Sequence, residues 1–242
     1  MAKIICIIAL CLAGTLLIAN DSIVAHYDFR EGTGTTLKDK SGNGLDCKIL
    51  NGKWVNAEYG SAIRFNGMNT GARGSGSSKL DMGKGDFTTC VFLKISQATK
   101  CFRILEKGAG NGSNGYRFYF RDKLGMIMGP ARPARYIVAR GNGGFRNRPV
   151  NDGKWHFISC VFDRKGNMRL YVDGEPSGKA KDIKNLKGLP VASNAGFLIY
   201  MGTDAKSSCI ISDIAIYKKA LTELQIKEKH AEILQKSSLK NK

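Results

Sequence analysis

The sequence predicts an all-β fold built from antiparallel strands, and three observations support this prediction. Glycine is abundant and proline is rare, at 29 and 5 residues, and the glycines separate short β-branched and aromatic runs. No segment before Leu221 has the apolar periodicity of an amphipathic helix. Residues 155–174 have the pattern of a β-hairpin, with Arg164-Lys165-Gly166-Asn167 as its turn.

The two arms of this hairpin differ in their apolar pattern. The first arm, Phe157–Phe162, is apolar on both alternating faces, which is typical of a strand covered on two sides. The second arm, Met168–Val172, alternates, so we expect one buried and one wetter face. Residues 71–78 are rich in Gly and Ser and are expected to form a loop.

The ends of the chain are distinct from its middle. Lys3, an apolar run through Ala19 and a polar switch at Asn20 are typical of a secretory signal peptide, here residues 1–19; an uncleaved anchor is the alternative. We expect one domain over residues 20–236, then a basic tail at 237–242. Thr222-Glu223-Leu224-Gln225 is a capping box and predicts a helix through about Gln235. The predicted location is therefore extracellular, or periplasmic in a Gram-negative host.

The strongest functional signal lies in residues 116–121. Period two places Arg117, Tyr119 and Arg121 on one face of a strand and the apolar aromatics on the other. Tyr136 and Arg140 repeat the pattern in the next predicted strand. Arg binds carboxylate and sulfate through two hydrogen bonds and stacks on rings, so these residues predict a site for an anionic sugar. A solvated basic face that only maintains solubility is the alternative.

The formal net charge is +18, a balance that attracts polyanions in general. For a secreted protein the candidate partners are acidic polysaccharides, sulfated glycans, teichoic acids, anionic lipid and extracellular DNA. The signal peptide disfavours intracellular nucleic acid, and the sequence has no zinc-finger, helix-turn-helix or RNP-type motif.

Four segments, in order, resemble the laminin G-like branch of the concanavalin A-like lectin and glucanase superfamily. They are Val24–Phe29 with Asp39-Lys40-Ser41-Gly42-Asn43-Gly44, Asp86–Lys94, the hairpin Trp155–Gly174 with its Leu-Tyr-Val-Asp-Gly, and Ile211–Leu221. The resemblance implies a jelly-roll β-sandwich of two antiparallel sheets with a short C-terminal helix. It does not imply one activity, because this fold hosts lectins, adhesion modules, glycosidases and lyases.

The resemblance also implies a structural calcium ion. By the motif match, Asp39, Asn43 and Asp213 would hold it, using the oxygen ligands that hard cations require. The alternative is that Asp39 and Asn43 form only side-chain-to-backbone turns.

Five cysteines follow the predicted signal peptide: Cys47, Cys90, Cys101, Cys160 and Cys209. In an oxidising compartment they allow up to two disulfides and one spare thiol, and the sequence assigns no pairing. Cys90 and Cys160 lie in apolar runs, where plain core residues are the alternative.

Three functions remain open. The first is a lectin-like module that binds acidic or sulfated polysaccharide. The second is a polysaccharide lyase, in which Arg117 and Arg140 neutralise a uronate while Tyr119 or Tyr136 moves the proton. The third is an adhesion domain for a protein partner. A retaining glycosidase is disfavoured because the motif Glu-x-Asp-x-x-Glu is absent and acids are sparse on the arginine-rich strands.

Overall fold

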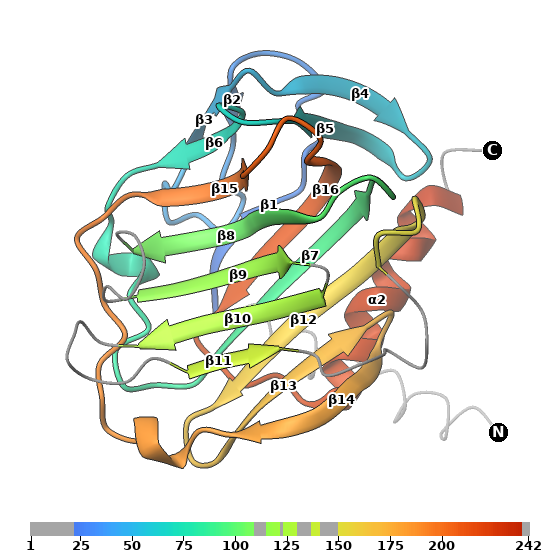
Figure 1. The fold of residues 1–242 in the computed structure, drawn as a ribbon. Coiled ribbons are helices and arrows are strands. Elements are labelled where there is room, and N and C mark those ends of the chain that lie inside the picture. Colours follow the sequence, from blue (N-terminus) through green and yellow to red (C-terminus); the bar gives the residue numbers. More distant parts are fainter. Residues whose placement is uncertain (1–21, 109–114, 122, 130–136, 141–149, 239–242) are drawn as a thin grey trace, which may run out of the picture.

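The computed structural model describes residues 22–108, 115–121, 123–129, 137–140 and 150–238, and these form a β-sandwich with one long helix (Figure 1). The predicted signal peptide and Tyr136 lie outside the described residues. Across the described ranges, no helix is both long and apolar enough to cross a membrane.

The first sheet, sheet A, has eight strands in the order β14-β13-β12-β7-β16-β5-β4, with β1 also paired to β16. Its strands are β1 (Ile23–Tyr27), β4 (Lys53–Ala57), β5 (Gly60–Asn66), β7 (Phe87–Ile95), β12 (Trp155–Asp163), β13 (Asn167–Val172), β14 (Glu175–Asp182) and β16 (Ser208–Tyr217). Every strand pair in it is antiparallel.

The second sheet, sheet B, also has eight strands, in the order β11-β10-β9-β8-β15-β6-β3-β2. Its strands are β2 (Thr36–Leu37), β3 (Cys47–Leu50), β6 (Gly71–Gly74), β8 (Cys101–Gly108), β9 (Gly115–Arg121), β10 (Lys123–Gly129), β11 (Ile137–Arg140) and β15 (Phe197–Gly202). Two short 3-10 turns, η1 (Ser78–Leu80) and η2 (Lys184–Leu186), and the helix α2 (Glu223–Ser238) complete the described elements. The two sheets confirm the predicted antiparallel sandwich.

The predicted hairpin is confirmed as β12 and β13. Ile158 pairs with Val172 and Asp163 pairs with Asn167, so the turn lies between residues 163 and 167, as expected. The chain then reverses into β14 through Asp173 and Gly174, whose φ angles are 53° and 80°. Two successive residues with positive φ are typical of a tight hairpin turn, and Asp and Gly tolerate this conformation best.

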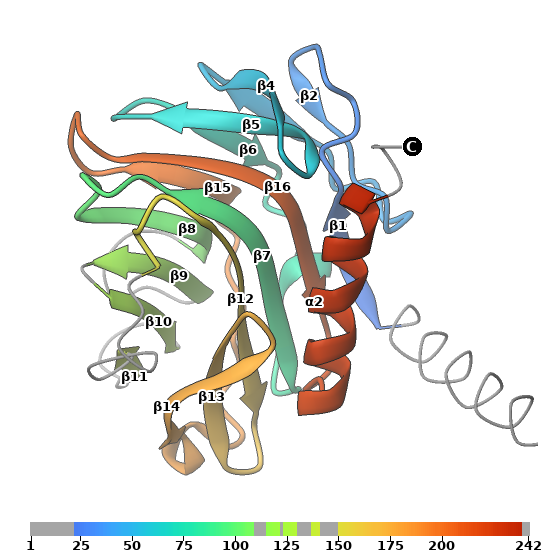
Figure 2. The ribbon, with the colours of Figure 1, turned by 90° about the vertical axis from the view of Figure 1, so that its right-hand side faces the viewer.

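The molecule has three layers: sheet B, sheet A and α2 (Figure 2). The main core lies between the sheets, and it includes the aromatic face of β9, formed by Tyr116, Phe118 and Phe120. A second apolar cluster lies between sheet A and α2, where Phe157 of β12 packs near Ile226 of the helix. This explains why β12 is apolar on both faces: sheet B covers one and α2 covers the other.

The helix α2 begins with the predicted capping box. The hydroxyl of Thr222 accepts the N–H of Gln225 at 3.2 Å, and the amide oxygen of Gln225 accepts the N–H of Thr222 at 3.0 Å. The helix extends to Ser238, so it is longer than predicted and includes the start of the segment expected to be a tail.

The glycine-rich segment at 71–78 was wrongly predicted to be only a loop, because its first residues form β6. Gly71 has a φ of 155°, and a Cβ there would lie 2.4 Å from the carbonyl oxygen of Tyr200. Glycine is therefore required for the close approach of β6 to β15, and glycine content alone does not exclude a strand.

Candidate functional site

A row of paired residues crosses the outward face of sheet B from β3 to β9. The register pairs Lys48 with Arg73, Arg73 with Leu198, Leu198 with Glu106, and Glu106 with Arg117. Directly paired residues share one face of a sheet, so these side chains form a continuous line. Lys48 and Arg73 are exposed. The line is basic at both ends, with Leu198 at its middle and one carboxylate, Glu106, next to its β9 end.

Glu106 holds two guanidinium groups on this face. Nε and Nη2 of Arg117 donate to its two carboxylate oxygens at 2.9 and 2.8 Å, and Nη1 of Arg103 lies 3.0 Å from Oε2. The side chains of Glu106 and Arg117 are only 6% and 10% exposed, whereas that of Arg103 is 26% exposed. The two parallel hydrogen bonds to Glu106 fix the plane of the Arg117 guanidinium group. The cluster has a net positive charge, because it contains two guanidinium groups and one carboxylate.

The predicted division of β9 into two faces is confirmed. Arg117 and Tyr119 lie on the outward face but are mostly buried, at 9% and 8% exposure, whereas Arg121 is exposed. The register pairs Gly125 of β10 with both Tyr119 and Arg140, so Arg140 lies in the same cross-strand row as Tyr119, two strands away. The backbone thus brings the described members of the predicted set onto neighbouring strands.

Four residues of this face escaped the sequence analysis: Lys48, Arg73, Arg103 and Glu106. For Lys48 the sequence did contain a signal, which is the alternation of apolar and polar residues. Lys48 lies between Cys47 and Ile49, which point into the core, so alternation places Lys48 on the outward face. Acids are sparse on β9 and β11, as expected, and Glu106 on the neighbouring strand β8 adds a carboxylate to the basic face. Glu106 lies opposite Arg117 because of the register between β8 and β9, and the local sequence does not determine that register.

The residues expected to hold calcium lie near one another, but protein donors already occupy Asp39. Its Oδ1 accepts the N–H groups of His26 and Ser41 at 3.1 and 2.9 Å. Its Oδ2 accepts the hydroxyl of Ser41 at 2.9 Å and the N–H of Leu45 at 3.0 Å. Burial would raise the pKa of Asp39, but these hydrogen bonds outweigh it and lower that pKa. A carboxylate with both oxygens used in this way does not fit a calcium ion in this conformation.

The other two expected ligands have protein partners as well. The amide nitrogen of Asn43 donates to the carbonyl of Val24 at 3.0 Å and to the hydroxyl of Ser41 at 3.2 Å. Asp213 pairs with Nε2 of His26 at 3.3 Å. Within the described ranges, no group of three or more His, Cys, Asp or Glu side chains is arranged to hold a metal ion. Calcium therefore stays a prediction, and the hydrogen bonds are those of the alternative turn interpretation.

His156, in the hairpin motif, lies between two carboxylates. Its Nδ1 is 2.9 Å from Asp173 and its Nε2 is 3.1 Å from Asp152. Burial alone would lower the pKa of His156, but the hydrogen bonds and charges of Asp173 and Asp152 outweigh burial and raise it. The Asp173 carboxylate also accepts the N–H of Phe157 at 2.9 Å. The motif therefore ties β12 to the β13–β14 turn.

All five cysteines of the described chain are free thiols, and four of them are buried: Cys47, Cys90, Cys160 and Cys209. Burial raises the pKa of Cys90 to about 12, which keeps this thiol protonated and unreactive. Cys90 and Cys160 are therefore plain core residues in this structure, in agreement with the alternative given above.

The two antiparallel sheets and the C-terminal helix define a jelly-roll β-sandwich. Residues 68–227 match the family described as the concanavalin A-like lectin/glucanases superfamily, and the chain belongs to this family. Among curated proteins, none matches the chain.

Several solved structures share the fold. The binding domain of Paraclostridial Mosquitocidal Protein 1 has a TM-score of 0.75 at 16% identity, covering 88% of this chain and 53% of that one. The ligand binding domain of botulinum neurotoxin serotype D, in complex with N-acetylneuraminic acid, has a TM-score of 0.70 at 16% identity. The match covers 89% of this chain and 52% of that one. The binding domain of botulinum neurotoxin DC, in complex with rat synaptotagmin II, has a TM-score of 0.68 at 15% identity. The match covers 89% of this chain and 52% of that one. This chain thus spans about half the length of the structures it matches, and the likeness concerns the fold.

Proposed function

We propose that the protein is a secreted, lectin-like module that binds acidic or sulfated polysaccharide on the outward face of sheet B. The observation that carries the proposal is the cross-strand line from Lys48 and Arg73 to the Arg103–Glu106–Arg117 cluster. Neighbouring strands lie about 4.8 Å apart, so an extended acidic chain that crosses the strands meets a basic group at short intervals.

The side chains on this face have different roles in the proposal. Lys48, Arg73 and Arg121 are exposed and attract the ligand by charge. Arg103 is partly exposed and carries a fork that binds carboxylate or sulfate. Arg117 gives its fork to Glu106 and therefore positions the cluster.

Two further facts support this choice of ligand. The net charge of +18 favours polyanions over neutral or cationic partners. A solved structure of the same fold holds N-acetylneuraminic acid, which is an acidic sugar. Secretion rests on the predicted signal peptide at residues 1–19, and extracellular polysaccharide is the matching partner in that compartment.

The first test is a panel of heparin, alginate and polygalacturonate, with binding and ultraviolet absorbance read on the same samples. Binding should be saturable and should weaken steeply with salt, because the Debye length falls from about 10 Å at 0.1 M to about 3 Å at 1 M. Binding that is insensitive to salt would show that the basic face is incidental.

A matched pair of double variants separates this face from diffuse charge. Lys48→Gln with Arg73→Gln removes two adjacent exposed charges from sheet B. Lys179→Gln with Lys181→Gln removes two exposed charges from β14, at the edge of sheet A. The first pair should lower affinity by about tenfold and the second by much less. Equal losses would mean that net charge alone carries the interaction.

Tyr119→Phe separates binding from catalysis. The variant keeps the ring and loses the hydroxyl, so a lectin should bind almost unchanged, whereas a lyase that uses this hydroxyl should lose turnover. Lyase products absorb in the ultraviolet, so absorbance that rises with the native protein and not with Tyr119→Phe would favour the lyase. If no glycan of the panel binds, a protein partner becomes the better hypothesis, since a neighbour in fold is solved with synaptotagmin II.

A further inference from the structure

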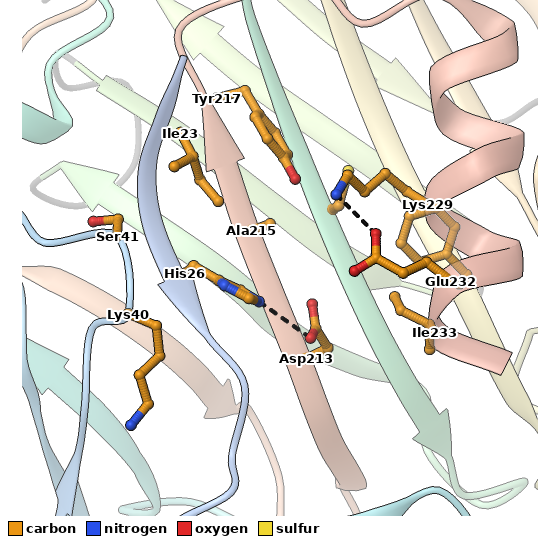
Figure 3. Close-up of a pocket in the computed structure, with 12 residues that line it drawn as sticks. Ile23, His26, Lys40, Ser41, Asp213, Ala215, Tyr217, Lys229, Glu232 and Ile233 are labelled. Atoms are coloured by element: carbon orange, nitrogen blue, oxygen red, sulfur yellow. Dashed lines mark hydrogen bonds and ion pairs between the residues drawn. The ribbon is translucent and has the colours of Figure 1, made fainter. Parts of the chain in front are cut away.

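A cavity lies on the other side of the molecule, between β1, β16 and α2 (Figure 3). Its volume is about 440 Å³, which is within the range of small-molecule sites. It lies beyond sheet A as seen from sheet B, and is therefore separate from the basic face (Figure 2). It is lined by Ile23, His26, Lys40, Ser41, Cys90, Phe157, Asp213, Ala215, Tyr217, Lys229, Glu232 and Ile233.

The charged groups of the cavity are paired within the protein. His26 of β1 lies 3.3 Å from Asp213 of β16, and Lys229 lies 2.9 Å from Glu232 on α2. The remaining charged group, Lys40, lies 3.5 Å from Glu31. An anionic ligand would have to break one of these pairs and leave a partly buried charge without its partner. The cavity therefore favours a neutral ligand over an anionic one.

Two polar atoms in the cavity have no hydrogen-bond partner among the described residues. One is the hydroxyl of Tyr217, a residue that is only 2% exposed; Figure 3 shows the hydroxyl pointing into the cavity, on the side where Lys229 and Glu232 lie. Burial, with the nearby Cys90, Asp213 and Glu232, raises the pKa of Tyr217 well above its usual value, so the hydroxyl is a donor. The other is Oδ1 of Asp213, because His26 contacts only Oδ2. The cavity thus offers a donor and an acceptor that the fold does not use.

Apart from Ser41 and the thiol of Cys90, the rest of the lining is apolar. Figure 3 shows Ile23, Ala215 and Ile233 around these polar atoms, and the rings of Phe157 and Tyr217 also line the cavity. A ligand that fits must place hydroxyl groups on the polar atoms and C–H groups on the apolar ones. A pyranose ring has this distribution, with hydroxyls at its edge and C–H bonds on its faces.

We propose that this cavity is a second binding site, which holds one neutral sugar unit between the His26–Asp213 pair and α2. The hydroxyl of Tyr217 donates to the sugar and Oδ1 of Asp213 accepts from it. The acidic chain on sheet B and the neutral unit in this cavity would then be bound independently.

The test is saturation-transfer NMR and calorimetry with the methyl pyranosides of glucose, galactose, mannose and N-acetylglucosamine. At least one should bind in a saturable manner at millimolar concentrations, and methyl glucuronide, which is charged, should bind less well. Absence of saturable binding by all four sugars, or stronger binding of the glucuronide in the cavity, overturns the proposal.

Two variants locate the binding, and one matched control accompanies them. Tyr217→Phe removes the unused hydrogen-bond donor and should lower the affinity for the sugar about tenfold. Ala215→Leu fills the cavity and should abolish binding. Tyr171→Phe is the control, because Tyr171 is also buried beneath α2 but does not line the cavity. Melting curves of each variant confirm the fold. If the Tyr217→Phe and Ala215→Leu variants bind the sugar with the affinity of the native protein, the sugar does not bind in this cavity and the proposal is wrong.

The two sites fail separately. The Lys48→Gln, Arg73→Gln variant should bind neutral sugar unchanged, and Tyr217→Phe should bind polyanion unchanged. Loss of polyanion binding alone would remove the proposed function and leave the cavity site standing, and the reverse result would remove only the cavity site.

Discussion

The outward faces of the two sheets have opposite chemistry on the same architecture. The outward face of sheet A carries large apolar residues such as Phe92, Phe157 and Tyr217, and α2 covers them (Figure 2). The outward face of sheet B carries Arg103, Glu106 and basic residues in line with them. A sheet face becomes structural when a helix covers it, and it stays available for a ligand when its alternate positions are charged.

The comparison also explains why composition alone could not locate a site. The basic residues of β14, at the edge of sheet A, contribute to the same net charge as those of sheet B. They lack a carboxylate such as Glu106 that orders two guanidinium groups at fixed distances. The arrangement of charge, more than its total, distinguishes the two regions.

The largest expected effect concerns the covered face. Ile226→Ala should lower the free energy of unfolding by about 3 kcal/mol, because Ile226 is fully buried between α2 and sheet A. Leu224→Ala is the control on the same helix; Leu224 is 62% exposed, so its loss should cost at most about 0.5 kcal/mol. Urea unfolding of both variants measures the difference. Equal costs would show that α2 is not part of the cooperative core.

The next effect concerns the charged face. Glu106→Gln should cost about 2 kcal/mol of stability, because the buried fork of Arg117 then bonds to a neutral amide. The same change loosens Arg103 and Arg117, which Glu106 holds in place, so polyanion affinity should fall by up to about fivefold even though one negative charge is removed. The free energy of unfolding and the affinity for heparin, measured on one preparation, test the two expected changes. Equal or higher affinity would show that the total charge of this face matters more than the order that Glu106 imposes.

A smaller effect distinguishes two histidines by pH, the buried His156 and the half-buried His230. His156 has a raised pKa in the folded state, so its contribution is fully present below about pH 6.5, the unfolded value, and is lost as pH rises through the raised pKa. Burial lowers the pKa of His230, which stacks on Phe157, so its contribution is present above that unfolded value and is lost as pH falls.

The measurement is the free energy of unfolding at several pH values for the native protein and two variants. The cost of His156→Gln should be greatest on the acid side of neutrality and should shrink as pH rises. The cost of His230→Gln should grow with pH. Parallel profiles would contradict the assigned roles of Asp173 and Asp152 around His156.

Much of the fold was predictable because local patterns determine it. The hairpin of β12 and β13, the two faces of β9 and the capping box of α2 all follow from alternation or from short-range chemistry. Glu106 was missed because its partner on β9 depends on the register between β8 and β9, and β6 was missed because its glycines serve a close approach to Tyr200. The Tyr217 cavity depends on β1, β16 and α2 together, and no single segment encodes it.

The smallest expected effect concerns the loop at Asp39, where two interpretations of the same residues differ. If a calcium ion holds the loop to β16, a chelator should lower the melting temperature by several degrees, because a ligand specific to the native state is removed. Both carboxylate oxygens of Asp39 accept hydrogen bonds from His26, Ser41 and Leu45, so we expect equal melting curves with calcium and with chelator. Asp39→Asn should still cost about 1 kcal/mol in both conditions, because it weakens charge-assisted hydrogen bonds that set the turn. A fall in the melting temperature on chelation that Asp39→Asn abolishes would restore calcium as the structural cofactor and would mean that the loop rearranges around the ion.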